Sequence, residues 1–99
     1  MDGELIGDRD VTVSLKRING LVSEAMKGQV SRGILVRLRE NFEMLRHYLS
    51  KEKRESFGLK AIDEKLSVLE SRNDIDELDV LVFIQERVEK ILSEIGVEY

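Results

Sequence analysis

Apolar residues recur along this 99-residue chain with alternating steps of three and four. Such steps place side chains on one face of an α-helix, because the helix completes a turn in about 3.6 residues. Four stripes of this kind follow one another, the last with one polar member. They are Val11, Leu15, Ile18, Val22 and Ala25; Leu35, Leu38, Phe42, Leu45 and Leu49; Leu59, Ile62, Leu66 and Leu69; and Leu78, Leu81, Gln85, Val88, Leu92 and Ile95. The spacing predicts helices that bury these stripes against one another.

Residues that start or end helices set the expected boundaries. Serine and aspartate are good N-caps, which assigns helix starts to Asp10, Ser31 and either Asp74 or Asp76. Glycine commonly ends helices in a left-handed conformation, which suits Gly28, Gly58 and Gly96. The expected helices lie near 10–27, 31–56, 59–71 and 76–95.

Short connections between these helices favour antiparallel neighbours, so the sequence predicts an all-α protein with a small antiparallel four-helix bundle. We expect a single domain over 10–96, preceded by a flexible tail over 1–9. One alternative concerns residues 11–25, where Val11, Val13 and Leu15 alternate and Asn19-Gly20 suits a hairpin turn. The apolar stripe continues through Gly20, which favours the helix.

The composition argues against catalysis and metal binding. The chain has one histidine and no cysteine, which is too few of the usual ligands for a zinc site. His47, beside Arg46, is interpreted as a boundary residue of a helix. The acidic run at 74, 76 and 79 is interpreted as helix capping, because it lacks the glycine and spacing of a calcium loop. We therefore expect a protein that is not an enzyme and needs no metal or cofactor.

The same totals bear on location. No apolar run approaches the roughly 18 residues that a membrane helix needs. The first ten residues carry acids and no apolar core, unlike a secretory signal. Disulfides are impossible without cysteine, so nothing suggests an oxidising compartment. We expect a cytoplasmic protein without membrane contact.

Charge is unevenly distributed along the chain. Residues 29–60 carry eight basic and four acidic side chains, whereas residues 61–99 carry four basic and eleven acidic ones. In one interpretation the basic second helix pairs with the acidic fourth, within the chain or across a dimer. In the other, arginines of the second helix contact nucleic-acid phosphates: Arg32, Arg37, Arg39 and Arg46.

One segment gives the second interpretation a sharper form. Gly28-Gln29-Val30-Ser31-Arg32-Gly33-Ile34 resembles the turn and recognition-helix start of helix-turn-helix regulators. The resemblance implies a nucleic-acid-binding regulator that uses the basic second helix. The overall net charge of −4 lacks the usual basic footprint of such proteins.

The preferred hypothesis is a non-catalytic helical interaction or oligomerisation module that binds another protein or itself. Residues 80–84 are five consecutive apolar residues, so the last helix either lies centrally or faces another subunit. We expect a homodimer, because a large exposed apolar patch is a liability on a monomer. The apolar residues beyond the core stripes would form the partner surface: Ile34, Met44, Tyr48, Val80, Phe83 and Ile84.

Overall fold

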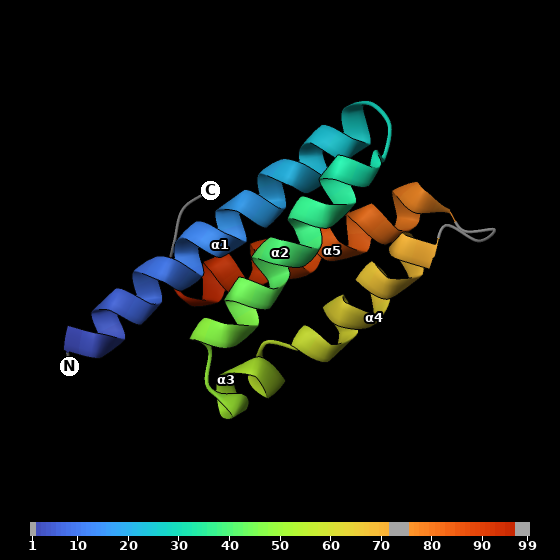
Figure 1. The fold of residues 1–99 in the computed structure, drawn as a ribbon. Helices are drawn as coiled ribbons and strands as arrows, with labels where there is room; N and C mark the ends of the chain where they lie inside the picture. The colour runs from blue at the N-terminus through green and yellow to red at the C-terminus, as the bar shows by residue number, and fades with distance from the viewer. Residues whose placement is uncertain (1, 72–75, 97–99) are drawn as a thin grey trace.

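The computed structural model of the chain describes residues 2–71 and 76–96, with side chains from residue 9 onward. These ranges contain five helices and no strand: α1 (Asp2–Lys27), α2 (Arg32–Tyr48), α3 (Lys51–Ser56), α4 (Leu59–Ser71) and α5 (Glu77–Glu94). The four long helices alternate in direction and form a bundle measuring 45 × 23 × 21 Å (Figure 1). The predicted all-α antiparallel bundle is confirmed.

The long helices pack as two antiparallel hairpins. α1 pairs with α2 and α4 pairs with α5, while α1 also packs on α5 and α2 also packs on α4. Figure 1 shows α5 behind α1 and α2, with α3 at the lower end of α2. α1 is continuous through Gly20, so the alternative of a β-hairpin over 11–25 is wrong.

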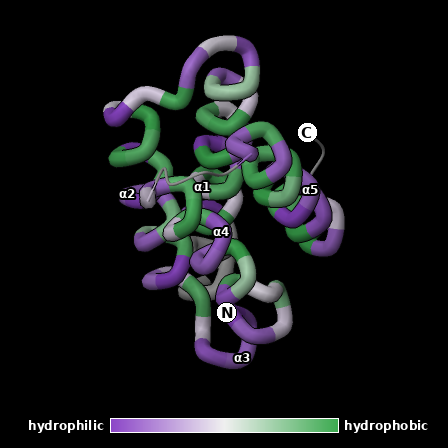
Figure 2. The backbone as a smooth tube through the Cα atoms, turned by 90° about the vertical axis from the view of Figure 1, so that its right-hand side faces the viewer, coloured by the Kyte–Doolittle hydropathy of each residue, from purple (hydrophilic) through white to green (hydrophobic). Residues whose placement is uncertain are grey.

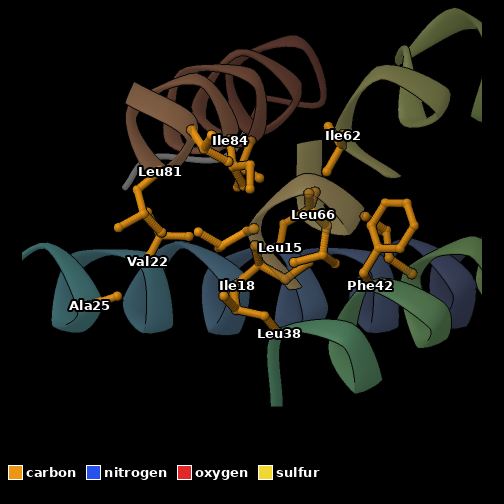
Figure 3. Close-up of a cluster of buried hydrophobic side chains, with 14 of the residues drawn as sticks. Leu15, Ile18, Val22, Ala25, Leu38, Phe42, Ile62, Leu66, Leu81 and Ile84 are labelled. Carbon is orange, nitrogen blue, oxygen red and sulfur yellow. The ribbon is translucent and has the colours of Figure 1, made fainter. Parts of the chain in front are cut away.

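The predicted stripes form the core almost without exception. Every member of the first and third stripes is buried, as are four of the five members of the second. Figure 3 shows side chains of α1, α2, α4 and α5 converging on this core, and Figure 2 shows hydrophobic and hydrophilic residues alternating along each helix. Leu78 is the main exception, because it is 55% exposed. Leu81, Val88 and Leu92 of the predicted fourth stripe are buried, and Val80, Ile84 and Ile91 widen the buried face of α5.

Several helix ends follow the predicted chemistry. Ser31 Oγ accepts a hydrogen bond from Ile34 N at 3.2 Å, and Asp76 Oδ1 accepts one from Asp79 N at 3.3 Å. Gly58 and Gly96 have the positive φ angles expected of glycines that end helices, 71° and 81°. Gly28 does not have a positive φ, so its predicted left-handed conformation is wrong.

Two boundaries differ from the prediction. The backbone is helical from Asp2, so residues 2–9 of the expected tail belong to α1, and Asp10 lies inside the helix rather than at its N-cap. The predicted helix over 31–56 is broken at Leu49 and Ser50, which are both extended. Ser50 Oγ accepts a hydrogen bond from Lys53 N at 3.2 Å, and this cap starts α3 as a separate helix.

Candidate functional site

The predicted partner surface is divided between the core and the exterior. Ile34, Val80 and Ile84 are 8%, 7% and 1% exposed and belong to the core. They face inward because α2 and α5 each pack against two long helices and therefore bury a wide arc. Met44 and Tyr48 are exposed, each at 38%.

Phe83 is half-buried on α5 and is covered by cations of its own chain. Lys65 Nζ, from α4, lies 5.2 Å from the centroid of the Phe83 ring, and Arg87 Cζ lies 5.1 Å from it. Contacts of this length are attractive, because a cation interacts with the electron-rich face of an aromatic ring. Phe83 is therefore partly covered, unlike the exposed side chains of Met44 and Tyr48.

Arg39 is the centre of a polar network between α2 and α4. Its Nη1 lies 2.7 Å from Asp63 Oδ1 and 3.2 Å from Glu43 Oε2. Its Nη2 and Nε donate to the two carboxylate oxygens of Glu70 at 2.8 and 3.1 Å, and Nη2 also donates to Ser67 Oγ at 3.2 Å. The Glu70 hydrogen bond raises the pKa of Arg39 above its ordinary value, partly opposed by burial, with Asp63 and Glu43 adding to the rise.

This network bears on one of the two interpretations of the charge distribution, in which the basic second helix pairs with the acidic fourth within the chain or across a dimer. Among the residues that the structure describes, the ion pairs from α2 to another helix lead to α4, which was expected as the third helix. The reason is spatial, since Arg39 projects from the flank of α2 that faces α4. Its guanidinium group is occupied by carboxylates, which leaves it poorly placed to contact a phosphate. Pairing of the basic and acidic helices across a dimer stays a prediction.

The four predicted phosphate contacts do not form one patch. Arg46 Nη1 lies 3.2 Å from Glu43 Oε1 on the same helix. Arg32 and Arg37 are exposed, and neither forms an ion pair with the residues that the structure describes. Arg37 lies on the flank of α2 next to α1, whereas Arg39 lies on the flank next to α4.

The segment Gly28–Ile34 forms the connection between α1 and α2 and the first turn of α2. α2 runs back alongside α1 (Figure 1). In helix-turn-helix motifs the two helices instead cross at about 90–120°. The connection is thus that of an antiparallel helical hairpin.

An open hollow of about 410 Å³ lies between α1 and α2 on the outside of this hairpin. Its α1 side is formed by Arg17, Gly20, Leu21 and Glu24, and its α2 side by Arg37 and Asn41.

Exposed apolar residues extend the hollow toward one end of the hairpin. Val13, which is 39% exposed, lies one turn before Arg17 on α1. Met44 and Tyr48 lie one and two turns after Asn41 on α2. Because the two helices are antiparallel, these three residues continue along the same surface, which we call the α1/α2 face.

A second hollow of about 370 Å³ lies beside α3 and is rich in cations. Its charged lining consists of Arg46, Lys51, Arg54 and Lys60, together with Glu55 and Asp63. Asp63 is paired with Arg39 and Arg46 with Glu43, which leaves Lys51, Arg54 and Lys60 against Glu55, so positive charge predominates. Such a lining favours an anionic ligand over a cationic one.

Within the described ranges, no group of three His, Asp or Glu side chains is arranged to hold a metal ion. His47 is exposed and packs edge-on against Tyr48, with ring centroids 5.7 Å apart. The capping role proposed for Asp74 falls outside the described residues, whereas Asp76 has that role. None of the helices described is both long enough and apolar enough to cross a bilayer.

Comparison of the chain with protein-family models, curated proteins and solved structures found no match.

The α1/α2 face includes residues that sequence reasoning missed. Arg17 and Glu24 were not among the predicted site residues, and Gly20 entered the sequence analysis only as part of the alternative hairpin turn. The available signal was their spacing, since with Val13 they form a second stripe with steps of three and four beside the core stripe.

Proposed function

We propose that this protein is a non-catalytic helical interaction module that binds another protein surface through its α1/α2 face. One observation carries the proposal: Val13, Met44 and Tyr48 are exposed on this face beside a hollow that their own chain leaves open. Apolar side chains around a hollow with a few charged groups at its edge are typical of protein-binding surfaces. The proposal assigns the module to the cytoplasm, which suits a chain without cysteine.

The bundle itself supports a binding role over a catalytic one. Most residues of the apolar stripes are buried in the core. The single histidine of the sequence, His47, is exposed at the end of α2. Tyr48 offers a large amphipathic ring at low entropic cost, and residues of this type often anchor interfaces. Met44 beside it adds a flexible apolar contact.

The experiment compares four single variants as tagged baits in extract from the source cells. Met44→Glu and Tyr48→Glu place a charge on the α1/α2 face. Val36→Glu and Val68→Glu are matched controls, because both residues are exposed apolar positions on other surfaces and Val68 has nearly the same exposure as Met44. We expect wild-type protein and both controls to retain the same partner, including any untagged copy of the chain. Equal retention by all four variants would refute the assignment of this face.

The second candidate function is binding of the phosphate backbone of a nucleic acid. It is supported by the cationic hollow beside α3, where Arg46 is joined by Lys51, Arg54 and Lys60. The assay is retention on heparin with a salt gradient. Salt-sensitive retention that is lost in Lys51→Ala/Arg54→Ala would support this function, whereas flow-through of wild-type protein at low salt would eliminate it.

A further inference from the structure

The exposed stripe on α1 contains a glycine that the chain itself does not require. Gly20 lies in the middle of a helix, and a Cβ built on it would meet no described atom within 4 Å. Its φ is not positive, so backbone conformation does not require glycine either. Glycine at this position weakens a helix relative to alanine. What a missing Cβ does provide is room for another backbone to approach closely.

The charges around Gly20 have a twofold pattern. Arg17 lies three residues before Gly20, and Glu24 lies three residues after Leu21. If a second α1 crosses in the opposite direction about the midpoint of Gly20 and Leu21, each Arg17 faces the partner's Glu24. The same rotation places the partner's Leu21 over Gly20. Such an interface is self-complementary, as a twofold dimer requires.

Neither charge has an ion-pair partner in the part of its own chain that the structure describes. Arg17 and Glu24 are seven residues apart, which is about 10 Å along a helix and too far for direct contact. Both line the open hollow between α1 and α2. On α1 the hollow thus offers one cation and one anion, placed symmetrically about Gly20-Leu21 and without an ion pair to the described residues. Arg37, on the α2 side of the hollow, adds a second cation.

We infer that a second copy of this chain binds the α1/α2 face, with the two α1 helices antiparallel and Arg17 paired with the partner's Glu24. The inference rests on the function proposed above and names the partner. The symmetry gives two equivalent ion pairs in each dimer, and Gly20 allows the helices to approach at their crossing point. Val13 then lies opposite the C-terminal end of the partner's α1.

Charge reversal tests both the partner and the register. In Arg17→Glu, two glutamates face each other across each contact, and in Glu24→Arg two arginines do. We expect sedimentation equilibrium to show dimerisation weakened about 10- to 100-fold in each single variant, from attraction replaced by repulsion at two sites. Lys60→Glu is the control for net charge, because Lys60 is exposed on α4, beside α3, and does not line the hollow between α1 and α2. It is expected to retain the wild-type dimerisation constant.

Mixing the two single variants gives the decisive measurement. In a dimer of Arg17→Glu with Glu24→Arg, both contacts again join opposite charges, so the equimolar mixture is expected to dimerise as tightly as wild type. The double variant Arg17→Glu/Glu24→Arg is expected to recover in the same way. Circular dichroism of each variant checks that the exposed substitutions leave the helices intact.

Two results would overturn the inference. A wild-type chain that stays monomeric at millimolar concentration would exclude the second copy as partner. A wild-type dimer whose variants show no recovery on mixing would exclude the antiparallel register. Neither result decides the proposed function. That function is tested separately, by whether Met44→Glu and Tyr48→Glu lose the partner that wild-type protein retains.

Discussion

Replacing Arg39 with methionine tests whether α2 and α4 are held together by the polar network as well as by the core. Methionine keeps much of the length of the stem but removes every charged hydrogen bond to Asp63, Glu70 and Glu43. The Arg39 side chain is 25% exposed, which places its contacts between surface pairs and buried ones. Surface pairs contribute about 0.2–1 kcal/mol each, and hydrogen bonds to charged groups about 1.5–3 kcal/mol.

The bidentate contact with Glu70 and the short contact with Asp63 carry most of the effect. Allowing for solvent screening and for shared partners, we expect Arg39→Met to lower the free energy of unfolding by about 2 kcal/mol. In a domain of this size that corresponds to a fall in Tm of roughly 8–16 °C. Thermal unfolding followed by circular dichroism measures it.

Arg46→Met is the matched control. Among the described residues Arg46 forms its ion pair with Glu43, on the same helix, and its side chain is 41% exposed. We expect a loss below about 0.5 kcal/mol, as for other exposed pairs within a helix. A similar loss in both variants would mean that the network between helices adds nothing beyond a local pair, and the reasoning would be wrong.

A double-mutant cycle and the pH dependence provide further checks. Glu70→Gln combined with Arg39→Met is expected to show a coupling energy of about 1 kcal/mol, because the two side chains contact directly. The pairing raises the pKa of Arg39, so the stability it contributes is fully present at neutral and mildly alkaline pH and is lost on the alkaline side only above the raised value. The difference between Arg39→Met and wild type is therefore expected to be the same at about pH 7 and about pH 9.

Three further substitutions give separate expectations. Phe42→Ala removes a ring that is 1% exposed and is expected to cost about 3–5 kcal/mol in urea unfolding; a loss below 1 kcal/mol would contradict the packed core. Gly58→Ala is expected to lower stability by about 1–2 kcal/mol, because φ of 71° is unfavourable for alanine; an unchanged Tm would contradict this. Gly20→Ala is expected to stabilise the monomer by about 1 kcal/mol, because the added Cβ meets only open space. The same substitution is expected to weaken the dimer in sedimentation experiments, and a tighter dimer would contradict the inferred crossing point.

Most of the fold was predictable because one physical rule dominates it. The three- and four-residue steps through Leu15, Leu38 and Leu66 specify helices with one apolar face, and these residues are buried where the faces meet. The resulting architecture is insensitive to small errors at the helix ends. This explains why the bundle was predictable although its boundaries were not.

The predicted helix boundaries were wrong where two local conformations have nearly equal free energy. At Leu49-Ser50, continuing the helix competes with an N-cap by Ser50, and each option is favoured by only about 1 kcal/mol. Leu78 illustrates a different difficulty, because α5 is apolar over so wide an arc that two stripes can be drawn. The chain buries members of both stripes, because α1 and α4 flank the helix, and leaves Leu78 in its first turn exposed.

The candidate site was predictable only in part. Met44 and Tyr48 were singled out as apolar residues beyond the core stripe, and both are exposed. The sequence did not reveal that Arg39 forms ion pairs with carboxylates of its own chain, because composition gives the charges but not the distances between them. It also gave no reason to join Arg17 to Arg37, since the hollow that they line exists only once α1 and α2 are paired.

None of the six side chains of α3 is buried, although this helix joins the two halves of the bundle. The junction between the hairpins can thus be lengthened, cut or replaced without removing an atom from the interior. An inserted epitope or a second binding loop between Ser50 and Phe57 would be carried by the scaffold while α2 and α4 kept their places. This protein therefore has a natural grafting position, at the end of the molecule where its cations gather.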